Sequence, residues 1–222
     1  MSVTSICAAD GTVRPTVLGM LLFGENPQEH LPQAYIDLVS YESATADGNA
    51  ADSKRVDGRL LDQVETVLQY FKTSPLIAVR SEKDGAGRQD AHAYSLIALQ
   101  EALVNAVVHR DYEIAGSQIQ VYLFPDRVEF RNPGGLHNTL TVEDLYAGCH
   151  GVRRNQLLAG FFRDYQSPVT GRSFMEARGE GFINIIRECK ELGARQPDLR
   201  VVGQSMRLTV FSAGETTRTT DG

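Results

Sequence analysis

Residues 96–112, LIALQEALVNAVVHRDY, carry the clearest helical pattern in this chain. Apolar residues recur there at intervals of three and four, so one face of a helix is expected in the core. Glu101, Asn105 and His109 interrupt the apolar residues at intervals of four, which places them along one side of that helix. A carboxylate, an amide and an imidazole aligned in this way can bind one ligand.

Composition indicates a globular chain of 222 residues, with 42% apolar and 23% charged residues. The length suits one large domain, or one domain and a fragment of another. The net charge of −6 and the pI near 5.4 oppose contact with a phosphate backbone. We therefore expect any effect on DNA to be indirect.

The three cysteines, Cys7, Cys149 and Cys189, are widely spaced and form no C-x-x-C pair. This pattern favours a reducing compartment and argues against a disulfide framework or a zinc site. The sequence contains no long apolar run and no signal-peptide pattern at its start. A cytoplasmic protein without membrane contact is the resulting expectation.

Turn residues and periodicity predict the other elements. In chain order these are a buried strand or short helix at 15–24, a strand at 34–41, an exposed loop at 42–57, a helix at 60–71, and strands at 76–79, 118–124, 127–131 and 206–211. The predicted fold class is α+β, a two-layer α/β sandwich in which the helix of residues 96–112 packs on a sheet of the last four strands.

Two glycine motifs follow the central helix. Asn132 opens N-P-G-G-L directly after a predicted strand, where Gly134 and Gly135 allow the backbone to approach a ligand closely. Gly179 and Gly181 open a predicted helix that runs to about residue 192, and a helix start of this kind is suited to phosphate. Between the two motifs, residues 137–178 are long and weakly patterned, which is typical of a lid.

In order and spacing, EALVNAVVHRDY (101–112), RNPGGL (131–136) and RGEGFINI (178–185) resemble the N, G1 and G2 boxes of the GHKL ATPase superfamily. They are more closely similar to the ATP-binding domain of proteins labelled RecG-related helicases or Schlafen-AlbA-type transcriptional regulators. The resemblance implies a Bergerat-type ATP-binding fold preceded by a partial α/β segment. It divides the chain into a disordered start (1–13), a partial Schlafen-AlbA-like segment (14–58), a GHKL-like domain (59–212) and a disordered tail (213–222).

The resemblance also implies residue roles, with ATP and Mg²⁺ as ligands. Glu101 would be the general base that activates water, and Asn105 would be a magnesium ligand. Asn132 stands where most of the superfamily has an aspartate that accepts a hydrogen bond from adenine, and its amide accepts that bond without charge. The other residues expected around the nucleotide are His109, Arg110, Gly134, Gly135, Arg153, Arg154, Asn155, Gly179 and Gly181.

Simpler interpretations stand beside these roles. Glu101 and Asn105 also fit a partly exposed helix edge, while His109 and Arg110 fit a helix end whose dipole they complement. The arginines at 153 and 154 also fit plain surface charge.

Two functional classes remain: an ATPase whose lid responds to nucleotide, and a non-catalytic regulatory or assembly module. In either class the partner would be a second copy of the chain or another protein. A genuine helicase is not expected, because the sequence contains no G-x-x-x-x-G-K-[ST] phosphate loop.

Overall fold

A computed structural model describes residues 5–46, 50–78, 80–84, 87–91, 93–137, 139–149, 153–175 and 180–213. At its centre lies a mixed sheet of six strands. In spatial order these are β4 (Ala50–Val56), β3 (Ile36–Tyr41), β7 (Ile119–Leu123), β8 (Arg127–Pro133), β10 (Ser205–Phe211) and β9 (Asp198–Val202).

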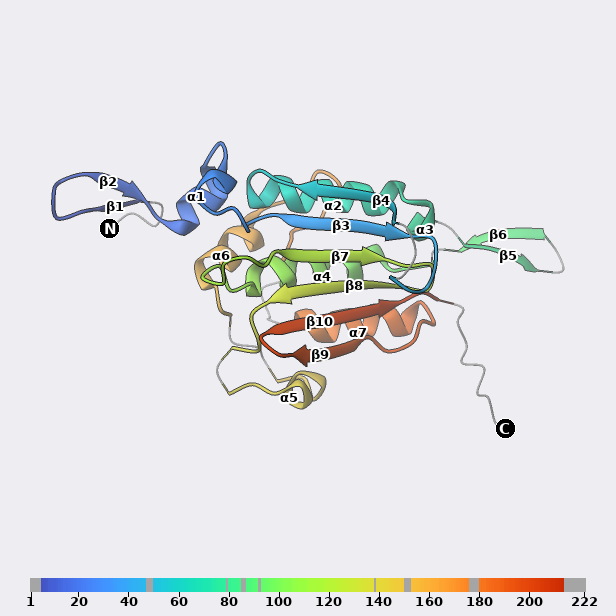
Figure 1. The fold of residues 1–222 in the computed structure, drawn as a ribbon. Helices are drawn as coiled ribbons and strands as arrows, with labels where there is room; N and C mark the ends of the chain where they lie inside the picture. The colour runs from blue at the N-terminus through green and yellow to red at the C-terminus, as the bar shows by residue number, and fades with distance from the viewer. Residues whose placement is uncertain are drawn as a thin grey trace.

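Helices cover one face of this sheet and leave the other face open (Figure 1). They are α1 (Val17–Phe23), the 3-10 turn η1 (Pro27–Glu29), α2 (Leu60–Thr73), α3 (Pro75–Ala78), α4 (Leu96–His109), α5 (Val142–Tyr146), α6 (Gln156–Asp164) and α7 (Gly181–Glu191). The α2, α4 and α7 helices lie behind the strands and form the second layer (Figure 1). The predicted α+β sandwich is therefore confirmed.

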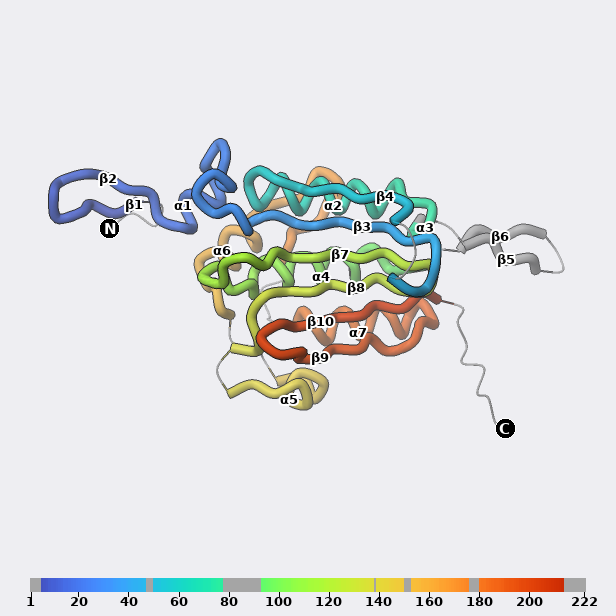
Figure 2. The backbone as a smooth tube through the Cα atoms, viewed as in Figure 1, coloured from blue at the N-terminus to red at the C-terminus, as the bar shows by residue number. Residues whose placement is uncertain are grey.

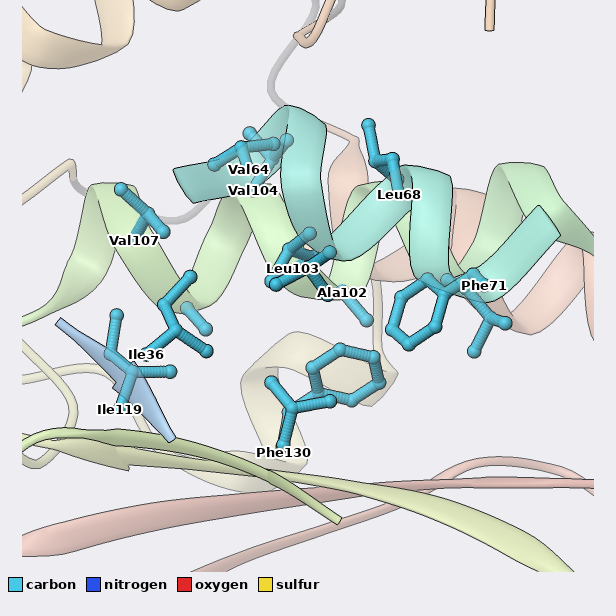
Figure 3. Close-up of a cluster of buried hydrophobic side chains, with 14 of the residues drawn as sticks. Ile36, Val64, Leu68, Phe71, Ala102, Leu103, Val104, Val107, Ile119 and Phe130 are labelled. Atoms are coloured by element: carbon cyan, nitrogen blue, oxygen red, sulfur yellow. The ribbon is translucent and has the colours of Figure 1, made fainter. Parts of the chain in front are cut away.

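The α4 helix is the centre of the core. Ser95 caps its start by accepting a hydrogen bond from the Ala98 N–H at 3.3 Å. Residues on nearly every side of α4 are buried, as expected for a helix that packs on the sheet and on neighbouring helices. Val104 of α4 lies beside Val64 of α2, and Leu103 of α4 points into the space between α2 and Phe130 of β8 (Figure 3).

Alternation along the strands explains which side faces the helices. In β7, Ile119, Val121 and Leu123 are buried, whereas the residues between them are partly exposed. The β3 strand pairs with β7 in parallel, and every other pairing in this sheet is antiparallel among the described strands. The strands predicted at 118–124 and 127–131 are β7 and β8, which form an antiparallel hairpin with a tight turn between them.

Two short hairpins lie outside the sheet. One pairs β1 (Ser5–Cys7) with β2 (Val13–Pro15), and the other pairs β5 (Arg80–Asp84) with β6 (Gly87–Ala91). The first stands apart from the sheet at the amino-terminal end (Figure 2). In this hairpin, hydrogen bonds between Ala8 and Thr12 and between Gly11 and Ala8 stabilise the turn that joins the two strands. The predicted tail at 214–222 lies outside the described residues.

Other differences have local causes. The predicted loop at 42–57 contains β4, an edge strand whose mostly exposed residues show no alternation of apolar and polar types. The predicted strand at 76–79 is instead the helical turn α3, in which Pro75 occupies the first position, a place that suits proline. The ambiguous segment 15–24 forms a helix, capped by a 3.0 Å hydrogen bond from the Gly19 N–H to Thr16 Oγ1.

The expected division after residue 58 falls within one structural unit, because β3 and β4 share the sheet with β7 and β8. Gln63 of α2 reinforces this connection by donating to the carbonyls of Ala34 and Gly58 at 2.9 and 2.8 Å. Within the part of the chain that the structure describes, no helix is both long and apolar enough to cross a lipid bilayer.

Candidate functional site

The amino-terminal end of α7 meets the polar side of α4. A methyl group added to Gly181 would collide with the Glu101 carboxylate and lie 2.9 Å from Asn105 Nδ2. A larger residue at this position would therefore force the Glu101 carboxylate and the Asn105 amide to move. At the other end of the contact, Ser95 Oγ donates to the Glu188 carboxylate at 2.7 Å and joins the two helices.

Glu101 and Asn105 form a pair one helical turn apart. Asn105 Nδ2 donates to Glu101 Oε1 at 3.3 Å, and Glu101 is 8% exposed. Because the amide uses its nitrogen for this contact, its oxygen is left for another ligand. The pair is thus a built feature of the fold and not an exposed helix edge.

Asn132 presents a buried polar group without a partner. Its residue is 6% exposed, and among the described residues its Oδ1 accepts no hydrogen bond. The side chain lines the same cavity as Glu101 and Asn105, beside the apolar groups of Phe130 and Leu208. A buried acceptor without a hydrogen bond is costly, and a ligand that donates to it would remove that cost.

One cavity brings together most of the residues that the sequence singled out. Of the expected site residues, those that line it are Glu101, Asn105, His109, Asn132, Gly135, Arg153, Arg154 and Gly181. Gly179 lies outside the described residues. Leu136 and His137 extend the wall after the glycine turn, and Leu199 and Met206 add apolar surface from β9 and β10.

His109 is neutral in this setting. Burial is the largest cause that lowers its pKa to about 4, and the positive charges of Arg153, Arg154 and His137 contribute to the same shift. At neutral pH the imidazole therefore offers one donor and one acceptor without a charge. The positive charge at this side of the cavity comes from the two arginines.

Arg154 connects three segments at the rim of the cavity. Its guanidinium donates to Asp111 Oδ2 at 2.8 Å and to the Gly135 carbonyl at 2.9 Å. Gly134 has a φ of +107°, and a methyl group there would lie 2.9 Å from Asp111 Cβ. Gly134 is therefore required for packing against Asp111, and not for room beside a ligand.

Two expected phosphate contacts lie elsewhere. Arg110 is 1% exposed, and its guanidinium donates to the Ser117 carbonyl at 2.7 Å, away from the cavity. Asn155 donates from Nδ2 to the carbonyls of Val108 and Arg110, both at 2.8 Å, and so caps the end of α4. In both cases the side chain donates to backbone carbonyls at a helix end and in the following loop, which would otherwise be unpaired.

Asp111 was missed by sequence reasoning. It accepts from Arg154, and its N–H donates to the Pro133 carbonyl at 3.0 Å, which fastens the end of α4 to the glycine turn. Its position directly after His109 and Arg110 was the available signal. A run of charged residues does not by itself reveal an ion-pair partner 43 residues away.

The described chain forms an α+β domain with one polar cavity, and part of its sequence matches a known family. Residues 116–210 match the family described as "Putative ATP-dependent DNA helicase recG C-terminal", which supports the RecG-related, ATPase-like character of the domain. The fold is similar to the crystal structure of the DIP2311 protein from Corynebacterium diphtheriae, with a TM-score of 0.69 and 22% identity over 92% of this chain. This chain spans 38% of that protein's length. A comparison with curated proteins gave no match.

Proposed function

We propose that this chain binds ATP with Mg²⁺ in the cavity between α4, α7 and β8, and hydrolyses the nucleotide slowly. The observation that carries the proposal is that one cavity is lined by groups from all three sequence motifs. These groups are Glu101, Asn105, Asn132, Gly135 and Gly181. The family match over 116–210 supports the same interpretation.

The residues present fit such a ligand at both ends. Asn132 Oδ1 is a buried acceptor without a partner in the described chain, which suits the amino group of a base. At the other end, the side chain of Glu180 makes no capping hydrogen bond to α7, so the first N–H groups of that helix are available to phosphate oxygens. Arg153 and Arg154 add positive charge beside them.

Asn105 is the residue that would hold the metal. The described residues contain no group of three His, Cys, Asp or Glu side chains arranged for a metal ion. This agrees with a cation held by one amide oxygen, substrate phosphates and waters, which is a common arrangement for Mg²⁺. When bound, the ion would neutralise charge on the phosphates.

Glu101 would orient a water molecule and accept its proton. Its burial beside Gly181 places the carboxylate at the start of α7, where phosphate is expected. The same carboxylate already accepts a hydrogen bond from Asn105, which favours a second candidate function. In that case the chain is a regulatory module of the GHKL type that binds ATP without turnover.

The conformational effect of nucleotide binding would be transmitted to the rest of the chain by residues 137–178. Arg154 joins the cavity to α6, whose Phe161 packs edge-on against Phe23 of α1 at 5.7 Å between ring centroids. Closure of this lid on ATP would therefore alter the surface formed by α1 and α6, where a second copy or another protein would bind in a transcriptional regulator of the Schlafen-AlbA type.

The test is calorimetric titration with ATP, with and without Mg²⁺, on the wild type and on Asn105→Ala. We expect Mg²⁺-dependent binding that Asn105→Ala weakens at least tenfold. Phosphate release is then compared for wild type and Glu101→Gln, which keeps the volume and removes the base. Binding that persists in Glu101→Gln without phosphate release supports hydrolysis. Binding without release from the wild type supports the regulatory module, and no binding by folded protein overturns both.

A further inference from the structure

We propose that Asn132 lets this site accept purine triphosphates with a 6-oxo group as well as ATP. The inference rests on the proposed nucleotide site and concerns its base selectivity. It follows from the chemistry of an amide whose orientation the protein does not fix.

The side chain of Asn132 is free to present either of its polar atoms. The residue is 6% exposed, and among the described residues its Oδ1 accepts no hydrogen bond. In most buried amides a neighbouring donor or acceptor determines which end points where. A rotation of this amide by half a turn breaks no hydrogen bond within the described residues.

The two orientations match two kinds of base. The edge of adenine offers an amino donor at position 6 and a ring acceptor beside it, whereas hypoxanthine and guanine offer an oxo acceptor and a ring N–H donor. An amide has one acceptor and two donors, so it can pair with either edge after rotation. A carboxylate only accepts, so it can pair with the amino group of adenine or with the ring N–H of a 6-oxopurine, but it has no donor for the 6-oxo oxygen.

Among the described residues, the carboxylates of the cavity come from other elements than the strand of Asn132. The carboxylates that line the described cavity are Glu101 and Glu180, which belong to α4 and the start of α7. Asn132 lies on β8, opposite Met206 of β10 in the register of the sheet. The side chains beside it in the cavity, those of Phe130 and Leu208, are apolar and provide stacking surface that does not distinguish purines.

The experiment compares ATP with inosine triphosphate, which carries the 6-oxo group but lacks the 2-amino group of guanine. Dissociation constants are measured by calorimetry, with Mg²⁺, for wild type, Asn132→Asp and the control Asn26→Asp. Asn26 is exposed and makes no side-chain cap hydrogen bond, so its substitution adds the same charge away from the cavity. Thermal unfolding confirms that each variant is folded.

We expect wild type and Asn26→Asp to bind both nucleotides within about tenfold of each other, since each base finds one matched orientation. Asn132→Asp should retain ATP and lose about 10- to 100-fold in affinity for inosine triphosphate, the effect of an unmatched buried polar pair. If the wild type binds ATP but binds inosine triphosphate more than about tenfold more weakly, the inference is overturned, while the proposed nucleotide site still stands. An equal loss of affinity for ATP and for inosine triphosphate in Asn132→Asp also overturns the inference. No binding of ATP by wild type overturns the proposed function itself.

Discussion

Arg154 and Asp111 form an ion pair with 2.8 Å between Nη1 and Oδ2, and this pair ties the end of α4 to the segment before α6. Their side chains are 19% and 25% exposed, so the pair is sheltered from water more than a surface pair. Because Arg154 also donates to the Gly135 carbonyl, the same guanidinium holds the glycine turn. One side chain therefore contacts both the end of α4 and the glycine turn at the rim of the cavity.

Breaking that pair should cost more than breaking an exposed one. In a double-mutant cycle with Asp111→Asn and Arg154→Met, we expect a coupling free energy of about 1–2 kcal/mol in urea unfolding. The matched control is Arg163 with Asp164, which are 48% and 76% exposed and should couple by less than about 0.5 kcal/mol. Equal coupling in the two cycles would show that the pair at the rim is not structurally important.

Gly181→Ala should disrupt the site. The added methyl group meets the Glu101 carboxylate, so we expect a loss of about 1–3 kcal/mol in the free energy of unfolding and at least a tenfold weaker affinity for ATP. Gly160→Ala in α6 is the control, because nothing lies within 4 Å of the added group. It should stabilise the fold by about 0.5–1 kcal/mol through helix propensity. Wild-type stability and affinity in Gly181→Ala would contradict the geometry.

Asn155 should prove to be a capping residue. Asn155→Ala removes two hydrogen bonds to the end of α4, at an expected cost of about 1–2 kcal/mol in the free energy of unfolding. Asn155→Asp should be no better, because a carboxylate cannot donate and is unfavourable at a helix carboxyl end. The affinity for ATP at a temperature where the variants are folded should change little. A tenfold loss of affinity at unchanged stability would instead restore the phosphate role expected from the sequence.

His109 should make the protein less stable in mild acid. Its pKa is lowered to about 4 in the fold by burial and by the nearby arginines, against about 6.5 when unfolded. The neutral form is thus favoured by folding. Its stabilisation is fully present above about pH 6.5 and is lost as pH falls toward 4.

Urea unfolding at pH 7 and pH 5 measures this effect. Between these two values we expect His109→Gln to lose about 1–2 kcal/mol less stability than wild type. His30→Gln changes an exposed histidine and should leave the pH dependence as it is in wild type. An unchanged pH dependence in His109→Gln would show that the imidazole is not held neutral.

Much of the site could be predicted because its residues follow local patterns. Helical periodicity placed Glu101 and Asn105 on one side of α4, and the glycine turn after a strand located Asn132. The edge strands β4 and β9 escaped prediction, since exposed edges tolerate polar residues and need no alternation.

The roles of Arg110 and Asn155 could not be read from the sequence. Both side chains satisfy backbone carbonyls, and the carbonyls that need them are known only once the chain has folded. Arg110 donates to Ser117 and also lies 3.4 Å from the carbonyl of Gln33, 77 residues earlier. Contacts of this kind depend on tertiary structure and leave no periodic signal.

The parallel pairing of β3 with β7 has a consequence for the order of folding. It joins two antiparallel halves of the sheet, β4 with β3 and β7 with β8, β10 and β9. Each half contains a pair of strands that are neighbours in sequence, β3 with β4 and β7 with β8, which can form early. The junction between the halves must wait for a crossover that contains α2 and α4. Since α4 carries Glu101 and Asn105, the same crossover that joins the two halves of the sheet also supplies two polar side chains of the cavity.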